Sequence, residues 1–544
     1  MRGATRVTRT VASVAAIALA AGACGGGGGD GGGGSGVVRA SWGDPQNPLE
    51  PANTNEVQGG KVLDMAFRGL KRYDPETGEA VDAMAESIET DDQRTFTVTI
   101  EDGWTFTDGT DVTASSFVDA WNYGALLTNN QVNAYFFQFI EGYDEVHPSD
   151  EGAEPTARTL SGLEVVDDTT FRVTLTEPFS LWPETLGYNA YAPLPRMFFE
   201  DHDAWLEKPV GNGPYKIDSY QRGQSMRLSK NEDYAGEDEA QNEGVELRVY
   251  TDNNTAYTDV QAGNLDVVDD VPASQVRNAE QDLDGRYINQ PAGIIQTLSF
   301  PLYDEDWEGE DAARLRRGIS MAINREEITS QIYGDTRTPA TDWTSPVLGE
   351  EGGYEEGLCG EACDYDPDRA KELIDGAGGL PGGGVTLTSN VDTGSHRQWM
   401  DAVCNSINNV MDDNGACRVD PVATFAEFRE RISGDRMRGM FRTGWQMDYP
   451  LIQNFLQPLY YTNASSNDSG YSNPEFDRLV DEANAAQDES TAVERFKDAE
   501  RLLAEDLPAV PLWYQNGSAG YSDRVEGVRL NPFSVPVYTD IKVN

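Results

Sequence analysis

Strand-like and helix-like segments are interleaved along most of this chain, and that mixture most constrains its fold. Residues 37–42, 95–100 and 170–176 alternate apolar and polar side chains, as half-buried strands do. Residues 421–432 and 491–504 instead repeat apolar side chains at helical spacing. The mixture predicts an α/β architecture. Because 544 residues exceed one ordinary domain, we expect about two to four domains.

The N-terminal segment predicts export and anchoring. Three arginines precede an apolar stretch, residues 11–23, that is too short for a permanent transmembrane helix. Cys24 directly follows small residues and resembles the cysteine of a bacterial lipobox, so we predict a signal peptide over residues 1–23 and lipidation of Cys24. Ordinary cleavage after Ala23, which leaves a free thiol, is the alternative. Residues 24–36 are almost all glycine and predict a flexible tether.

The strongly acidic composition excludes several partners. The formal net charge is −52, with 93 Asp and Glu against 41 Lys and Arg. Nucleic-acid binding needs clustered basic residues, so none is expected. Anionic membrane surfaces are disfavoured for the same reason, which leaves the lipid anchor as the expected membrane contact. A hydrophobic content of 38% is enough for substantial cores.

Four further cysteines fit an oxidising, extracytoplasmic setting. Four cysteines allow three pairings, and we predict disulfides between sequence neighbours, Cys359 with Cys363 and Cys404 with Cys417. A zinc site is the alternative. Their spacing differs from the common CxxC pairs and only His396 is near them in sequence, so no metal site is expected.

Signatures of catalysis are absent from the sequence. It contains no Gly-x-Ser-x-Gly elbow and no His-Glu-x-x-His helix. Residues 211–213 form a glycine turn that lacks the endings of a phosphate loop or a dinucleotide fingerprint. The three histidines, His147, His202 and His396, lie in polar, loop-like settings. We therefore expect neither an enzyme nor a cofactor.

Residues 439–450 combine groups that suit a zwitterionic ligand. Arg442 and Asp448 carry opposite charges, and six extended residues span about 20 Å. Trp445 offers an apolar wall, and Gly444 lets another chain approach the backbone. Taken alone, the stretch reads equally as a strand end with a surface ion pair.

Seven motifs in sequence order resemble the family 5 extracellular solute-binding proteins of ABC transporters, the oligopeptide- and dipeptide-binding group. The resemblance covers about residues 37–544, with Asn212 in place of a threonine and Gly318 and Asn324 as further departures. The motifs are FRGL…YDPETGE…TFTVTI…GWTFTDGTDVTASSFVDAW from residue 67, PVGNGPYK at 209–216, NEDY at 231–234, AGNLD…VP from 262, LRRGISMAINR at 315–325, GW…DY at 444–449 and GYSNPEFD at 470–477.

The resemblance implies a two-lobed fold like the type II periplasmic binding proteins, with a hinge and an extra inserted domain. A discontinuous lobe I is then expected at residues 37–58, 203–296 and 513–544. The inserted domain is expected at residues 59–202 and lobe II at residues 297–512.

The resemblance also implies ligand-binding residues. Asp448 matches the aspartate that fixes the α-amine of a peptide, and Arg442 matches an arginine that meets the carboxylate of some ligands. Gly444, Trp445 and Gln446 then supply the strand that pairs with the ligand backbone.

Residues elsewhere in the chain are expected to face this strand. Counting back from the FRGL motif gives Asn55 and Val57. Tyr135 resembles a tyrosine that lines the pocket from the inserted domain, with plain core packing as the alternative.

The predicted function is that of the lipoprotein substrate-binding component of an ABC importer. We expect a lipid-anchored monomer on the extracytoplasmic face of a bacterial cell membrane. It would capture oligopeptides in a closing cleft and deliver them to the membrane permease, with ATP hydrolysis in other subunits. The alternatives are the same fold with another solute, such as an oligosaccharide or a nickel complex, or an extracellular sensor or adhesin.

Overall fold

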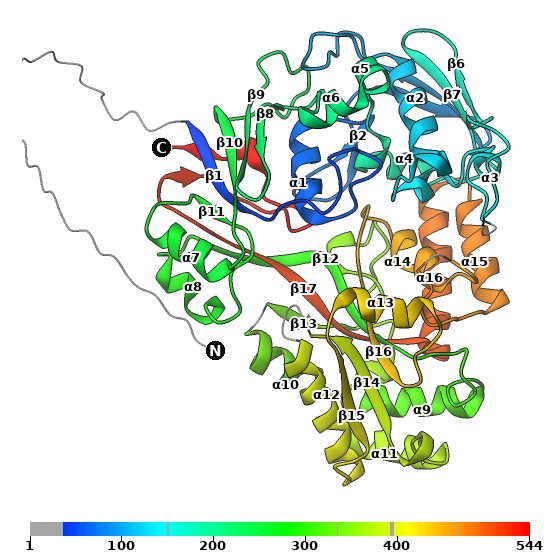
Figure 1. The fold of residues 1–544 in the computed structure, drawn as a ribbon. Coiled ribbons are helices and arrows are strands. Elements are labelled where there is room, and N and C mark those ends of the chain that lie inside the picture. Colours follow the sequence, from blue (N-terminus) through cyan, green and yellow to red (C-terminus); the bar gives the residue numbers. More distant parts are fainter. Residues whose placement is uncertain (1–35, 150–151, 335, 392–395, 465) are drawn as a thin grey trace, which may run out of the picture. The chain divides into compact units, whose positions relative to one another are not determined.

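The computed structural model describes residues 36–149, 152–334, 336–391, 396–464 and 466–544 (Figure 1). The predicted signal peptide, Cys24 and all of the tether except Gly36 lie outside the described residues. Helices and strands are mixed throughout the described part, as the sequence patterns predict.

The main sheet joins segments from the whole length of the chain. Its continuity depends on two long strands, β12 and β17, which pair antiparallel over most of their length with register shifts after Pro291 and Gln296. Among the described residues eleven strands belong to it, ten of them in this order: β15 (Cys417–Val422), β14 (Val385–Asn390), β16 (Met440–Gln446), β12 (Tyr287–Ser299), β17 (Ala509–Tyr521), β11 (Val267–Val268), β1 (Val37–Trp42), β10 (Gly244–Val249), β9 (Ser225–Lys230) and β8 (Tyr215–Gln221), with β13 (Arg337–Pro339) paired to β17.

A second, four-stranded antiparallel sheet packs against helix α2 (Ala114–Ala125). Its order is β4 (Ala85–Thr90), β5 (Thr95–Ile100), β7 (Thr170–Thr174) and β6 (Leu163–Val165). Phe117 of α2 stacks on Phe171 of β7, and Trp121 meets the same ring edge-on. Two-stranded ribbons complete the strands: β2 (Lys71–Tyr73) with β3 (Ala80–Asp82), and β18 (Val525–Glu526) with β19 (Lys542–Val543).

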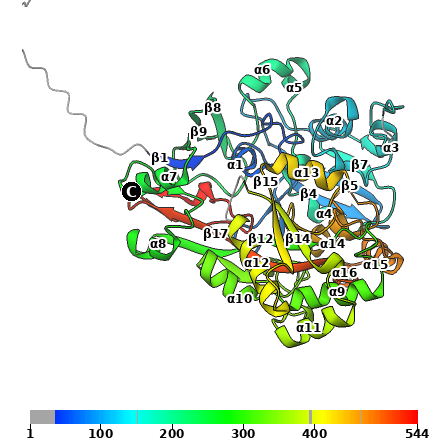
Figure 2. The ribbon, with the colours of Figure 1, turned by 60° about the horizontal axis from the view of Figure 1, so that its bottom comes forward.

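Helices cover both faces of the strands around β16. Helices α12 (His396–Met411) and α13 (Phe425–Ser433) lie on different sides of strands β14 and β15 (Figure 2). Met440 packs in the same core as α12, whereas its neighbour Phe441 packs with α13, because successive side chains of a strand point to opposite faces. The remaining helices are α1 (Val57–Ala66), α3 (Tyr143–Val146), α4 (Trp182–Thr185), α5 (Arg196–Glu200), α6 (His202–Glu207), α7 (Asn253–Gln261), α8 (Val276–Asp282), α9 (Glu310–Met321), α10 (Arg325–Ile328), α11 (Pro367–Gly376), α14 (Ile452–Tyr460), α15 (Pro474–Asn484) and α16 (Glu489–Asp506).

The structure corrects one helix prediction. Residues 421–432 were expected to be helical, but Pro421 and Val422 end strand β15. A proline is tolerated there because β15 lies at the edge of the sheet. The helix begins only after Thr424, whose hydroxyl accepts a hydrogen bond from the Glu427 amide at 3.2 Å.

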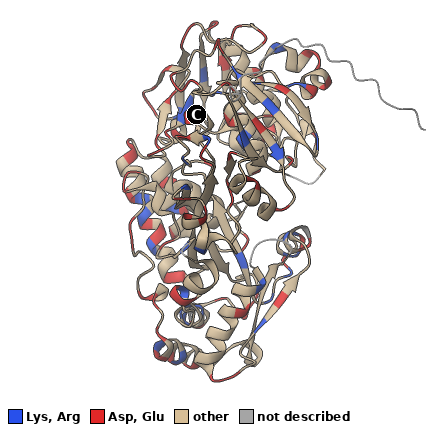
Figure 3. Cartoon of the chain, turned by 90° about the vertical axis from the view of Figure 1, so that its left-hand side faces the viewer, with Lys and Arg blue, Asp and Glu red and all other residues tan. Residues whose placement is uncertain are grey.

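The predicted cysteine pairs are brought together. The sulfur atoms of Cys359 and Cys363 are 2.06 Å apart, and those of Cys404 and Cys417 are 2.05 Å apart. Acidic and basic positions are interspersed over helices and loops in Figure 3. No helix in the described part of the chain is long and apolar enough to cross a membrane.

Candidate functional site

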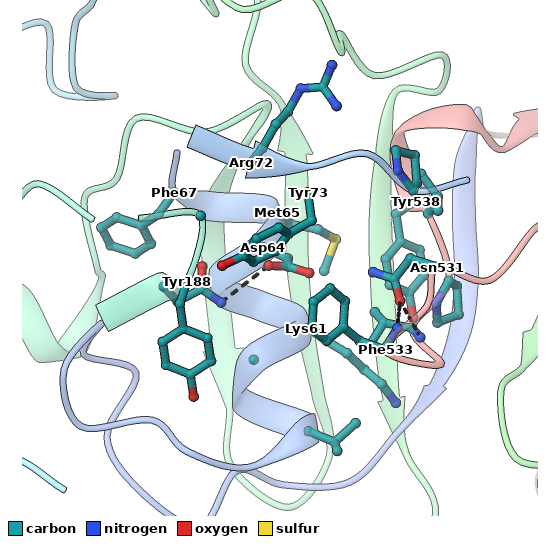
Figure 4. A pocket seen from close by; sticks show the side chains of 18 of the residues that line it. Lys61, Asp64, Met65, Phe67, Arg72, Tyr73, Tyr188, Asn531, Phe533 and Tyr538 are labelled. Carbon is teal, nitrogen blue, oxygen red and sulfur yellow. Dashed lines mark hydrogen bonds between the residues drawn. The ribbon is translucent and has the colours of Figure 1, made fainter. Parts of the chain in front are cut away.

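A pocket of about 420 Å³ is walled by segments from distant parts of the chain (Figure 4). Helix α1 and the ribbon after it form one wall, and residues 187–189 and 446–448 form another. The C-terminal segment, residues 529–540, closes a third side. Such a convergence of separate segments is typical of a small-ligand site.

Helix α1 presents one face to this pocket. Val57, Gly60, Lys61 and Asp64 follow the i, i+3, i+4, i+7 spacing that places side chains on one side of a helix. The carboxylate of Glu56 caps the helix by accepting hydrogen bonds from two backbone amides of its first turn, at 2.8 and 2.9 Å.

The glycine turn at residues 211–213 holds the other end of α1. The Asn212 side chain accepts a hydrogen bond from the Arg68 amide at 3.1 Å and donates one to the Arg68 carbonyl at 3.0 Å. The Gly213 amide donates to the Ala66 carbonyl at 2.8 Å. This turn therefore positions the pocket wall. Asn212, which stands where the family motif has a threonine, makes both hydrogen bonds to the Arg68 backbone.

Asn454 of α14 organises the stretch around Asp448. Its Oδ1 accepts hydrogen bonds from Trp445 Nε1 at 2.9 Å and from the Asp448 amide at 2.8 Å. Its Nδ2 donates to Asp448 Oδ2 at 3.2 Å. Sequence reasoning missed Asn454, although amides that fall on the buried face of a helix, here Gln453 and Asn454, are a signal of a structural hydrogen-bond role.

Asp448 is a carboxylate without a compensating cation. Burial raises its pKa to about 6, and hydrogen bonds from Asn454 and Tyr135 oppose that rise. Among the ion pairs of the described residues, none involves Asp448. Burial also raises the pKa of the surrounding Tyr135 and Tyr188, and the charge of Asp448 adds to both shifts. The site is thus suited to an incoming positive group.

Four of the predicted ligand residues line the pocket together: Asn55, Val57, Gln446 and Asp448. Tyr135 lies outside that lining, although its hydroxyl favours the ionised form of Asp448, whereas Phe136 and Phe137 beside it are buried in the core.

The other predicted residues lie on β16. Trp445 donates its hydrogen bond to Asn454, and Gly444 is exposed and pairs with Gln296 of β12. Arg442 does not line this pocket. Its Nε is buried with no hydrogen-bond partner, and burial lowers its pKa. The structure therefore does not bring Arg442 and Asp448 into one pocket.

One edge of β16 is left open. The antiparallel ladder with β12 runs from Phe441 to Gln446, but β14 reaches only Met440 and Phe441 on the other side. Within the described residues no further strand pairs with residues 442–446. This edge carries the backbone groups that an added strand needs.

Replacing Asn454 by alanine is expected to weaken the site. The half-buried Trp445 Nε1 and Asp448 amide would lose their shared acceptor, and a group left unsatisfied typically costs about 1–3 kcal/mol when it is fully buried, so we expect the lower end of that range for each. Urea unfolding should show a lowered free energy of unfolding. An unchanged value would contradict the organising role of Asn454, and Asn408→Ala, which removes two hydrogen bonds to the Cys417 backbone elsewhere, serves as a comparison.

The fold and the site define a two-lobed α/β binding protein of type II. Within the described ranges, no group of three or more His, Cys, Asp and Glu side chains is placed to hold a metal ion. The family model of bacterial extracellular solute-binding proteins, family 5 Middle, matches residues 79–467. The chain therefore belongs to the family 5 solute-binding proteins of ABC transporters.

Individual relatives resemble this chain over nearly its whole length. The oligopeptide-binding protein OppA of Bacillus subtilis is 25% identical over 90% of this chain and 89% of its own. The solved structure of the Escherichia coli murein tripeptide binding protein MppA has a TM-score of 0.76 and 22% identity, and the match covers 93% of this chain and 98% of that one. Haemophilus influenzae OppA in complex with RPPGFSPFR has a TM-score of 0.75 and 21% identity, with 94% and 99% covered.

Proposed function

We propose that this protein captures extracellular oligopeptides and delivers them to an ABC permease. Asp448 carries the proposal: a partly buried carboxylate without a protein cation is matched by the α-ammonium that every free peptide offers. In this assignment Asn55, Val57 and Gln446 contact the ligand near its amine, and Tyr135 holds the Asp448 carboxylate.

The open edge of β16 supports a peptide rather than another solute. A peptide laid along residues 442–446 would extend the sheet through its own backbone groups, which gives affinity without a sequence requirement. Gly444 keeps the approach clear, Trp445 lines it, and Arg442 meets the carboxylate of those ligands long enough to reach it. Two relatives point the same way, since their names specify an oligopeptide and a bound nonapeptide.

The proposed lobes meet in the two long strands. The predicted boundaries at 296/297 and 512/513 fall inside β12 and β17. We place lobe I at residues 37–58, 203–296 and 513–544 and lobe II at residues 297–512. The inserted domain, residues 59–202, is then built on the four-stranded sheet. Closure about the two strands would enclose the ligand.

Anchoring completes the proposal. Lipidation of Cys24 would hold a monomer at the extracytoplasmic face of the cell membrane, with the glycine tether between anchor and body. Neither catalysis nor a cofactor is required of this chain.

Blocking the ligand amine tests the assignment of Asp448. Calorimetry should show that a free tripeptide binds at least about tenfold more tightly than its N-acetylated form, because acetylation removes the charge that pairs with a buried carboxylate. The Asp448→Asn variant should bind the free peptide about tenfold more weakly than the wild type does, and it should bind the free and acetylated peptides with similar affinity.

A control variant and a second measurement complete this test. Asp119→Asn removes one charge from the exposed face of α2, outside the pocket, and should leave both affinities unchanged. Mass spectrometry of ligand released from the purified protein should detect peptides. Equal affinity for free and acetylated peptide would overturn the role of Asp448, and a copurified sugar would overturn the peptide proposal.

A further inference from the structure

A second carboxylate faces the same pocket. Asp64 lies on the pocket face of α1, and its side chain remains exposed to the cavity. Asn189 Nδ2 donates a hydrogen bond to Asp64 Oδ1 at 3.2 Å, so the carboxylate is oriented by the adjoining wall of residues 187–189 (Figure 4). One oxygen is held in this way and the other is left for a ligand.

The other charges of the pocket are largely neutralised by protein partners. Four of its five Lys and Arg side chains form ion pairs, and Arg72 is the exception. The pairs are Lys61 with Asp269, Arg68 with Asp238, Lys71 with Asp82 and Glu184, and Arg529 with Asp540. Asp64 and Asp448 take part in no ion pair of the described residues.

Arg68, one helical turn after Asp64, already has an acidic partner. The Arg68 guanidinium pairs with Asp238 and also donates to the backbone carbonyls of Asp64 and Phe67, at 2.6 and 3.0 Å. Burial raises the pKa of Asp64 in spite of Arg68, and the charge of Asp238 adds to that rise. The negative charge of the ionised Asp64 carboxylate is therefore not balanced by Arg68.

Aromatic side chains line the pocket that contains both carboxylates. Tyr188 lines the pocket together with Asp64 and Asp448, and the charges of both carboxylates add to the burial that raises the pKa of Tyr188. Tyr73 and Phe533 pack at 5.4 Å between ring centroids and line the pocket. Such walls accommodate the aliphatic stem of a basic side chain and attract its cationic head.

We propose that Asp64 is a specificity-determining residue that binds a second cationic group of the ligand. On the proposed function, this group is the ammonium or guanidinium of a basic side chain in a peptide whose α-ammonium lies at Asp448. The pocket then selects peptides with a lysine-like or arginine-like residue near the N-terminus over peptides with neutral or acidic residues there.

Matched peptides test this selection. Each of Lys-Ala-Ala, Ala-Lys-Ala and Ala-Ala-Lys is compared by calorimetry with its norleucine counterpart, which keeps the length of the side chain without its charge. We expect at least one lysine peptide to bind roughly tenfold more tightly than its counterpart, between the effects of exposed and buried pairs. Asp64→Asn should reduce that ratio to about one, because it keeps an acceptor for Asn189 but removes the charge.

The norleucine peptides serve as the internal control. Their affinity should be the same in the wild type and in Asp64→Asn, which shows that the variant is folded, and Asp119→Asn should retain the lysine preference. Equal affinities within all three pairs, or a preference that survives Asp64→Asn, would overturn the inference and leave the proposed function standing. Failure of all six peptides to bind would overturn the proposed function and this inference with it.

Discussion

Replacing Gly211 by alanine is expected to lower the free energy of unfolding by about 3 kcal/mol, the range of severe overpacking. A Cβ at this position would lie 2.0 Å from the carbonyl oxygen of Ala66. The backbone has little room to retreat, because that oxygen also accepts from the Gly213 amide and the Gly211 carbonyl accepts from the Thr107 amide, both at 2.8 Å. Urea unfolding at 25 °C measures the loss.

Gly60→Ala is the matched control for the same chemical change. Gly60 lies within α1, and an added Cβ would have no neighbour within 4 Å. Alanine there should stabilise the protein by about 0.5–1 kcal/mol, because glycine costs conformational entropy in a helix. Equal effects of the two substitutions would contradict the close packing of residues 211–213 on the end of α1.

The strands were the part of the fold most open to prediction from sequence. Residues 37–42 and 95–100 form strands with the predicted bounds, and residues 170–176 form one that ends two residues early. Strict alternation is a local property that survives folding because one face of each strand is buried. Residues 421–432 show the limit, because helical spacing alone did not reveal that Pro421 belongs to an edge strand.

Strand pairing could not be derived from local patterns. β1 lies between β10 and β11, more than 200 residues away in sequence, and β17 returns from the C-terminal part of the chain to pair with β11. Such neighbours depend on the global packing of both faces. The two-lobed fold was available before the structure only through the ordered motifs, whose resemblance to family 5 the family model confirms.

Some site residues could be predicted from local sequence and others could not. Asp448 belongs to a short motif, so a local match was enough to propose it. Asp64 lies in a helix whose spacing indicates only an amphipathic surface, and nothing in its neighbourhood indicates a pocket. Phe533 comes from a segment without helical or strand periodicity, and its approach to Tyr73 is a product of the fold. These residues became candidates only when the cavity joined them.

Affinity for trialanine is expected to fall about 30-fold between pH 7.5 and pH 4.5. Burial raises the pKa of Asp448 to about 6 in the ligand-free protein, and an ammonium partner favours the ionised form. Binding therefore releases a proton near pH 6. The affinity is fully present above pH 6 and is lost as the pH falls through that value. The peptide amine has a pKa of about 7.7–8.0, so its partial deprotonation lowers the affinity at pH 7.5 by less than about twofold and leaves the fall toward pH 4.5 to Asp448.

The Asp448→Asn variant separates this carboxylate from every other titrating group. The tyrosines around Asp448, Tyr73, Tyr135, Tyr188 and Tyr449, all have raised pKa values and stay neutral over the range, and trialanine offers no basic side chain to Asp64. Calorimetry should give a nearly flat pH profile of affinity for the variant, whereas an unchanged slope would assign the proton to another group.

The stability of the variant can be predicted from the same pKa. Because the folded-state pKa of Asp448 lies above its unfolded value, its ionised form costs stability above pH 6. The variant should therefore be at least as stable as the wild type at pH 7.5, and a weakened affinity there reports the lost charge contact rather than unfolding.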